Sequence, residues 1–368
     1  MSRIFPQSGM QGMQGMQGMQ GMQGMQGYSG AVSNPQLAYA MNLTRQDNQT
    51  GLDILDEESW VTAPSKWSGS ADKLPALNQA RHLKRWESSY RSVLISTDLV
   101  TSLSFTDDGK DTALVHYVAA DGKAATLASL TRPNRDQFVK QMNVVFSRAK
   151  QREARTAEIL TQTVPQYAYW SAICNLHPER TPKTMELLAT LLQFVLMVTQ
   201  RVKHTLACPR PIEYSTLVQP IILTPGHAAL PSGHSTEAFF VARIMADLIG
   251  GSQSGSRKKS QMFQLARRIA DNRVVAGLHF PVDSAAGYVL ADALAAYVMA
   301  RAKGGGTVKQ TRVFSVKHLD VGVLAQLDFL PGDQLWKERD VAVVKGPAIA
   351  KSDLLEWLWK QAKAEWSY

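Results

Sequence analysis

Three long hydrophobic segments with the period of an α-helix constrain most strongly what this chain can fold into. In the clearest one, apolar residues from Ala238 to Ile249 recur every three or four positions, and Gly250-Gly251 follow as a stop signal. The same pattern predicts a helix over 184–204 and another over about 282–302. The 368-residue chain is 45% apolar, which is enough for a large core. We therefore expect a mainly α protein.

Shorter β-like runs flank the helical part. Between about 92 and 131 they read SVLIS, SLSF, ALVHYV and ATLASL, with Asp-Gly pairs between them, which predicts strands joined by tight turns. Near the C-terminus, TRVFSV and VAVV predict two more short strands, and Ser352 is a candidate cap of a last helix. A helical pattern runs from Asn134 to Ala154, and Pro165 breaks the helical run that follows.

Six consecutive Met-Gln-Gly triplets occupy residues 10–27. Glycine at every third position opposes a stable helix, and the repeat lacks the proline that supports a collagen triple helix. We predict that residues 1–34 are a disordered tail and that residues 35–368 form a single domain. Association through the methionine-rich tail is the alternative, because Met side chains pack adaptably.

Bulk properties narrow the function classes. The net charge of +9 admits an anionic partner, but no nucleic-acid-binding motif accompanies it, so we expect no nucleic acid partner. The longest apolar run, 187–198, is interrupted by Thr190 and Gln193 and is shorter than the ~20 residues of a membrane span. No apolar leader opens the chain, and we expect a cytoplasmic protein without a membrane span. A homo-oligomer is compatible with the sequence, and Cys174 and Cys208 are either free thiols or one disulfide.

The stretch Pro231-Ser232-Gly233-His234 stands directly before a predicted helix. The N–H groups of a helix start lack partners and its dipole favours negative charge, so this position suits an anion. Gly233 removes a side chain that would block close approach, and His234 adds a titratable imidazole. A serine N-cap beside a surface histidine is the plain alternative.

Two further blocks carry charged residues at fixed spacing. The first places Lys203 and Arg210 at the end of a helix, where prolines hold the chain extended, and the second contains Arg273, His279 and Asp283. Taken singly, a basic residue at a helix end is a dipole partner and a histidine beside Phe is a packed side chain. Together the three blocks supply three cations, helix-start donors and two histidines, one of them with a carboxylate four residues on. That combination suits a tetrahedral or trigonal-bipyramidal oxyanion.

The blocks Lys-x6-Arg-Pro, Pro-Ser-Gly-His and Arg-x5-His-x3-Asp, in this order, resemble the signature of the type 2 phosphatidic acid phosphatase / vanadium-dependent haloperoxidase superfamily. The resemblance covers residues 203–283. It implies a helical bundle of the vanadium haloperoxidase / acid phosphatase type with small β embellishments. One position departs from the pattern, because Asn272 stands where a serine usually opens the third block. Asparagine still donates a hydrogen bond, so we expect the anion site to be intact.

The resemblance also implies roles for individual residues. In a haloperoxidase, vanadate is the cofactor, His279 ligates its vanadium, Lys203 polarises bound peroxide and His234 is the acid–base. Hydrogen peroxide, a halide and an organic substrate are then the partners. The residues implied to hold the oxyanion are Lys203, Arg210, Ser232, Gly233, Arg273 and His279.

In a phosphatase no cofactor is needed, and the partner is a phosphomonoester. His279 attacks phosphorus, Asp283 orients His279, and His234 protonates the leaving oxygen. The large helical haloperoxidases are favoured by the roughly 200 residues before the first block and by His227 in TPGHAALPSGH, since algal bromoperoxidases resemble this chain in carrying a second histidine there. A surface-loop role is the plain alternative for His227, and LHFPVD resembles phosphatases in lacking a tryptophan. A non-catalytic anion-binding or scaffold protein is the third alternative.

Overall fold

The computed structural model describes residues 36, 39, 40, 43, 76–164, 166–250, 253–304, 311–314, 341–344 and 346–367, with the side chains of 253–257, 311–314 and 341–344 left aside. The predicted tail, residues 1–34, and Pro165 lie outside this set. The chain divides into two compact units with a boundary between Lys84 and Arg85, and the description below concerns the unit that follows this boundary. A single domain over 35–368 stays a prediction.

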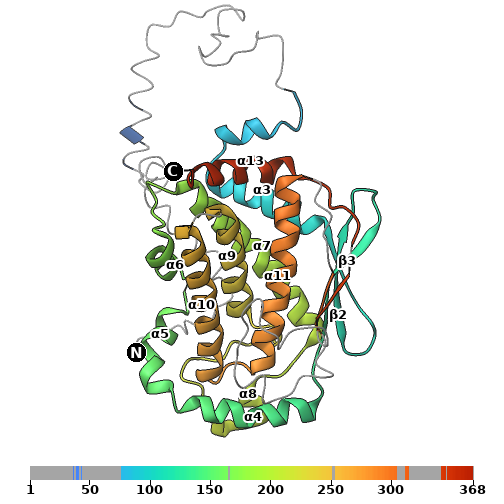
Figure 1. Ribbon diagram of the computed structural model, residues 1–368, viewed down its shortest axis with the longest axis vertical. Helices are drawn as coiled ribbons and strands as arrows, with labels where there is room; N and C mark the ends of the chain where they lie inside the picture. Colours follow the sequence, from blue (N-terminus) through green and yellow to red (C-terminus); the bar gives the residue numbers. More distant parts are fainter. Residues whose placement is uncertain are drawn as a thin grey trace, which may run out of the picture. The chain divides into compact units, whose positions relative to one another are not determined.

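The protein is mainly α-helical, as the hydrophobic periods predict. Figure 1 shows α9, α10 and α11 side by side with α7, while α4 crosses one end of this group and α3 and α13 lie at the other. The helices are α3 (Ser88–Thr101), α4 (Arg135–Ala149), α5 (Arg152–Thr161), α6 (Tyr167–Cys174), α7 (Pro182–Leu206), α8 (Pro211–Tyr214), α9 (Gly233–Ile249), α10 (Gln253–Val275), α11 (Pro281–Lys303) and α13 (Asp353–Ala364), with 3-10 turns η5 (Ala80–Arg85) and η6 (Thr216–Val218).

The sheet lies beside α7 and α11 (Figure 1). Its strands are β1 (Leu103–Asp107), β2 (Thr112–Val118), β3 (Ala124–Thr131), β4 (Thr311–Phe314) and β5 (Val341–Val344), in that order across the sheet. The first three form the antiparallel meander that the Asp-Gly turns predict, β4 pairs parallel to β3, and β5 is antiparallel to β4. At the first turn Asp108 Oδ1 accepts the N–H groups of Lys110 and Thr112, both at 3.0 Å.

The prediction of a strand at SVLIS is wrong, because these residues belong to α3. The buried positions of α3 include Arg91, Ile95 and Leu99, which follow one another at four-residue steps and so form one helical stripe. Ser96 Oγ donates to the carbonyl of Thr190 on α7 at 3.0 Å. Packing against α7 therefore overrides the local β propensity of the Val and Ile side chains.

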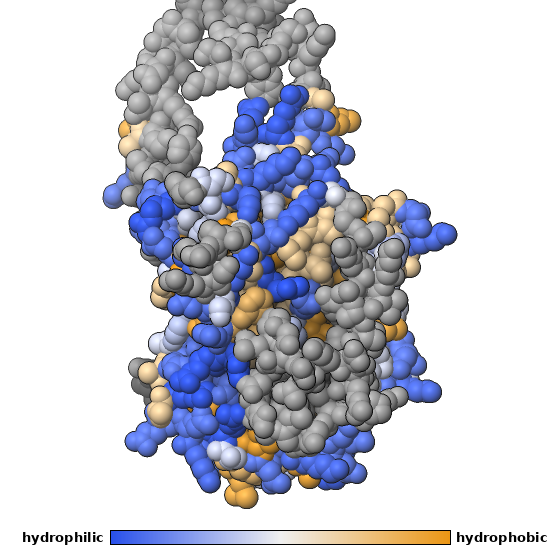
Figure 2. Space-filling model, viewed as in Figure 1, coloured by the Kyte–Doolittle hydropathy of each residue, from blue (hydrophilic) through white to orange (hydrophobic). Residues whose placement is uncertain are grey.

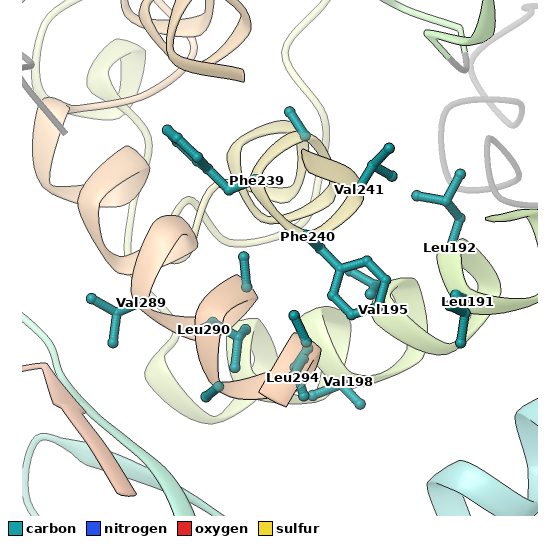
Figure 3. Close-up of a cluster of buried hydrophobic side chains, with 14 of the residues drawn as sticks. Leu191, Leu192, Val195, Val198, Phe239, Phe240, Val241, Val289, Leu290 and Leu294 are labelled. Atoms are coloured by element: carbon teal, nitrogen blue, oxygen red, sulfur yellow. The ribbon is translucent and has the colours of Figure 1, made fainter. Parts of the chain in front are cut away.

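The core is built mainly where α7, α9 and α11 meet. Figure 3 shows Phe240 of α9 directed toward Val195 of α7, with Leu290 and Leu294 of α11 completing the cluster, and all four are 0% exposed. Most of the described surface in Figure 2 is hydrophilic. Cys174 and Cys208 are both buried free thiols, so the disulfide alternative is not formed.

The two ends of α7 are fixed by different devices. At the start, Glu365, just past α13, accepts the N–H of Lys183 and the N–H of Thr184, each at 2.8 Å, and so caps a helix start whose own N-cap residue, Thr181, makes no side-chain cap. At the other end, Ala207 adopts a left-handed conformation with φ 47° and turns the chain out of the helix. The residues after this turn enter the site described below.

Two helical segments, Pro182–Tyr214 and Pro281–Lys303, are long and apolar enough to cross a membrane by length and composition alone. Core helices of soluble proteins pass the same test, and 56% and 78% of the respective apolar windows are buried inside the protein. This is weak support for a span, and the expected lack of one stays a prediction.

Candidate functional site: a cationic pocket between three helix ends

The first block contributes two buried cations. Lys203, on the last turn of α7, donates from Nζ to the carbonyls of Ala228 at 2.7 Å and Ala229 at 2.8 Å, which leaves one of its three protons unassigned. Burial, and next the charge of Arg210, hold the pKa of Lys203 well below its usual value. The extended backbone at Arg210 (φ −87°, ψ 160°) agrees with the flanking prolines.

Arg210 uses its donors on neighbouring protein groups. Nε donates to the carbonyl of His227 at 3.1 Å, Nη1 donates to the carbonyl of Leu278 at 3.0 Å, and Nη1 also lies 3.1 Å from Nε2 of His279. Nη2 lies 3.1 Å from Nδ1 of His227. Burial lowers the pKa of Arg210 to about 10, which leaves it a cation at neutral pH. Arg210 therefore supplies charge and holds the two histidines in place.

The start of α9 forms the second wall, and Ser232 is its N-cap, which agrees with this part of the plain alternative. Ser232 Oγ accepts the N–H of Ser235 at 3.5 Å, and a Cβ at Gly233 would meet no atom within 4 Å, so open space lies beside the first residue of α9. His234 Nε2 lies 2.9 Å from the carbonyl oxygen of Gln162. A carbonyl only accepts, so Nε2 carries the proton and Nδ1 is the basic atom. Burial and Arg273 lower the pKa of His234 to about 3.

Arg273 is 0% exposed and keeps two nitrogens free. Nη2 donates to the side-chain oxygen of Gln162 at 3.1 Å and to the carbonyl of Ile159 at 3.2 Å. Nε and Nη1 have no hydrogen-bond partner among the residues that the structure describes. Buried guanidinium nitrogens are rarely left unpaired, so these two donors mark the place of a missing acceptor.

Asn272 positions a side chain that contacts Arg273. Its Nδ2 donates to Glu158 Oε2 at 2.9 Å and to Gln162 Oε1 at 3.0 Å, while its Oδ1 accepts from Arg155 at 3.2 Å. The amide thus fixes the acceptor that holds Arg273. This agrees with the expectation that asparagine leaves the anion site intact.

His279 and Asp283 are partners, although His279 precedes α11 and the pair is not stacked on a helix. Nδ1 of His279 lies 3.0 Å from Asp283 Oδ2, which also accepts the N–H of Phe280 at 2.9 Å. The proton therefore sits on Nδ1, and the lone pair of Nε2 is directed away from the carboxylate. Burial, and next Arg210, hold the pKa of His279 well below its usual value, while burial raises the pKa of Asp283 to about 7.

One pocket collects most of the predicted site residues. Its lining includes Arg210, His227, Gly233, His234, Arg273 and His279. Lys203, Ser232 and Asp283 stand behind this lining, where they hold it in place. The cavity measures about 60 Å³, and because a buried water needs about 10–15 Å³ on this scale, there is room for several waters or one tetrahedral oxyanion. Among the described residues, no group of three or more His, Cys, Asp or Glu side chains is arranged to hold a metal ion.

Five residues of this region are not predicted from the sequence. Gln162 and Glu158 reach the site from α5 and its C-terminal turn, and Thr199, Gln200 and Glu237 line the pocket. The α7 residues could have been found from helix spacing, because Thr199 and Gln200 stand four and three residues before Lys203. Glu237 likewise follows His234 by one turn of α9.

The family model described as the PAP2 superfamily matches residues 184–304, which run from the first turn of α7 to the end of α11. The chain contains a PAP2 superfamily domain. The PAP2 domain therefore includes all three blocks, and the superfamily expected from the resemblance is confirmed for this part of the chain. No curated protein matches the sequence.

PAP2 superfamily membership implies chemistry of the phosphatase or haloperoxidase type, and PAP2 members are generally enzymes. The PAP2 fold can bind phosphate or vanadate. The pocket fits either oxyanion, because the unpaired Nε and Nη1 of Arg273 and the N–H of Gly233 are donors that both ions accept.

Proposed function

We propose that this pocket binds a tetrahedral or trigonal-bipyramidal oxyanion and that the protein is a vanadium-dependent haloperoxidase. The observation that carries oxyanion binding is the pair of unpartnered donors on the buried Arg273. Arg273, the N–H of Gly233 and Nε2 of His279 would hold vanadate, and Lys203 would add its positive charge from behind the lining. Vanadate bound there would supply the activation of hydrogen peroxide for oxidation of a halide.

The two histidines of the pocket have different proton states, which suits two different roles. Asp283 keeps the proton of His279 on Nδ1, so Nε2 carries a lone pair. That lone pair accepts from Nη1 of Arg210, and this hydrogen bond must break before Nε2 bonds to the central atom of an oxyanion. His234 holds its Nε2 proton on Gln162 and accepts a further proton at Nδ1. Its pKa of about 3 reflects burial and the nearby charge of Arg273 without a bound anion. A bound anion stabilises the imidazolium and raises that pKa, so His234 gains the capacity to donate a proton.

His227 favours the haloperoxidase over the phosphatase. Its ring lines the pocket and lies 3.1 Å from Arg210, which supports a role in the site over the surface-loop alternative. Burial, and next Lys203 and Arg210, lower the pKa of His227 to about 4, so it is a neutral base at physiological pH. A neutral imidazole beside the oxyanion can take the proton of an incoming peroxide.

A phosphatase is the second candidate, favoured by the carboxylate of Glu237 in the same pocket. A carboxylate repels a halide but accepts a hydrogen bond from an organic leaving group. In this reaction Nε2 of His279 attacks phosphorus, the bond from phosphorus to the ester oxygen breaks, and His234 gives a proton to that oxygen. Water then hydrolyses the phosphohistidine and restores His279.

Two assays on one preparation test these proposals: bromination of a phenol reporter with peroxide, with and without added vanadate, and hydrolysis of p-nitrophenyl phosphate. His279→Ala should abolish either activity, and His234→Ala should lower turnover by about 10²–10⁴-fold with oxyanion binding largely kept. Lys203→Ala should weaken oxyanion binding itself. His204→Ala, on the exposed face of α7 next to Lys203, is the control and should change neither. Full turnover in His279→Ala would exclude this pocket as the catalyst.

A further inference from the structure

One face of α7 carries, at the pocket, a threonine whose hydroxyl no described residue uses. Thr199 and Gln200 each lie three or four residues from both Leu196 and Lys203, so the four side chains share a face of α7, and the first three line the pocket. Thr199 is 1% exposed, and its Oγ1 has no hydrogen-bond partner among the described residues. A threonine within a helix usually bonds to the carbonyl four residues back, as Thr190 does with Glu186 at 2.8 Å.

The opposite wall adds a carboxylate that is equally unused. Glu237 lies one turn after His234 on α9 and lines the same pocket. Within the described part of the chain it makes no ion pair and no hydrogen bond. Burial raises the pKa of Glu237 to about 7, against the opposing influence of Lys203. The carboxyl group is therefore held in a protected place without a partner of its own.

These groups do not fit the oxyanion. Phosphate and vanadate present oxygens that accept hydrogen bonds, and a carboxylate beside them adds repulsion. A carboxylate instead accepts a donor, and a threonine hydroxyl both donates and accepts. Together with the amide of Gln200 they complement hydroxyl groups on an organic molecule.

We propose that Thr199, Gln200 and Glu237 form a polar subsite that binds the hydroxyl groups of a small organic molecule attached to, or lying beside, the oxyanion. This inference rests on the proposed oxyanion binding. In a phosphatase the molecule is the alcohol part of the ester. In a haloperoxidase it is the organic compound that receives the halogen. In both cases Glu237 and Thr199 determine substrate specificity.

The test uses ligands that this chemistry does not hydrolyse. Calorimetry compares 2,3-dihydroxypropylphosphonate with n-propylphosphonate, which differ only in their hydroxyl groups, and inorganic phosphate serves as the oxyanion alone. Wild-type protein should bind the dihydroxy compound about tenfold more tightly, the size of one charge-assisted hydrogen bond. A second arm titrates the phosphate-loaded protein with phenol, which carries a hydroxyl but no oxyanion. If the protein prefers the dihydroxy phosphonate but does not bind phenol, the subsite binds a group attached to the oxyanion. If phenol binds, the subsite binds a separate molecule beside the oxyanion.

The variants separate the subsite from the oxyanion pocket. Glu237→Gln and Thr199→Val should each bring the two phosphonates to within about threefold of each other. Affinity for inorganic phosphate should stay unchanged in Thr199→Val and unchanged or higher in Glu237→Gln, because a negative charge is removed. Glu153→Gln, at an exposed position of α5, is the matched control and should keep the preference. Thr199→Ser, which retains the hydroxyl, should keep the preference for the dihydroxy phosphonate.

Each outcome is decisive. If phosphate binds but wild-type protein treats the two phosphonates alike and ignores phenol, the subsite is overturned and the oxyanion proposal stands. If the preference survives in both variants, Glu237 and Thr199 are not its source, which also overturns the proposal. If phosphate and vanadate both fail to bind, the proposed function and the subsite fall together. Thermal unfolding of each variant shows that a lost preference is not a lost fold.

Discussion

Gly287 sets the distance between the two helix starts that build the pocket, and enlarging it should reduce function more than stability. It lies one turn after Asp283 in α11, against the start of α9. A Cβ at this position would stand 2.8 Å from the carbonyl oxygen of Ser232 and 2.8 Å from Cβ of Ser235. The first of these atoms belongs to the backbone and cannot swing aside.

The expected cost follows from these distances. Ordinary contact begins near 3.4 Å, so a methyl group at 2.8 Å must push the helices apart by roughly 0.5 Å. Overpacking of this kind costs about 1–3 kcal/mol, and replacing a helical glycine by alanine returns about 0.5–1 kcal/mol. The net loss in unfolding free energy is then about 0–2.5 kcal/mol. The same shift moves Gly233 away from His279, and since a 1 Å misplacement costs roughly 10²-fold, about tenfold in turnover is expected.

Gly287→Ala would be measured by urea unfolding and by whichever of the two activities the wild-type protein shows. Gly226→Ala is the control, because a Cβ there would meet nothing within 4 Å and the backbone is not left-handed. The control should keep activity within about twofold. Wild-type activity in Gly287→Ala, or a loss of activity that is matched by complete unfolding, would refute the idea that this contact sets the pocket.

Three further predictions concern other parts of the structure. Gln162→Met removes the side-chain acceptor of Arg273 at nearly constant volume and should weaken phosphate binding about tenfold in calorimetry. An unchanged affinity would show that packing and the carbonyl of Ile159 hold Arg273 without Gln162. Glu365→Ala removes the cap of α7 and should lower the urea-unfolding free energy by about 1–2 kcal/mol, and an unaltered transition midpoint would contradict this. Burial raises the pKa of Glu237 to about 7, so its negative charge appears as the pH rises through 7. Over that range the phosphate affinity of the wild-type protein should fall relative to that of Glu237→Gln. A ratio of the two dissociation constants that does not change with pH would contradict this prediction.

The sequence predicts the helices well because their hydrophobic residues must face one core. The period over 184–204 marks α7, and the period over 282–302 marks α11 to within about two residues. The sequence also predicts the turns of the small sheet, because glycine accepts the positive φ of a tight turn, as at Gly109 and Gly122, and aspartate bonds to the backbone of the turn. The strand expected at SVLIS failed since α7 supplies a partner for the helical stripe of α3, and no local pattern shows that partner.

Some residues of the candidate site could be predicted from the sequence, and others could not. Residues placed by local chemistry were predictable: the N-cap Ser232 stands at a helix start, and Arg210 stands between two prolines. Gln162 was not, because its contribution depends on the C-terminal turn of α5 meeting α10, more than a hundred residues further along the chain. The pocket roles of Glu237 and Thr199 depend equally on which faces of α9 and α7 surround the cavity.

The starts of α9 and α11 are joined by their main chains, and this has a consequence for how the pocket is lost. The N–H of Ser232 donates to the carbonyl of Asp283 at 2.8 Å, and Ser235 Oγ donates to the carbonyl of Ser284 at 2.7 Å. Amides inside such a joint exchange with deuterium only when both helices open together, which places them in one cooperative unit. The pocket should therefore persist through local fluctuations of the sheet and disappear in a single step with the helical core. Deuterium uptake at Ser232 and loss of oxyanion binding should then share one denaturant midpoint.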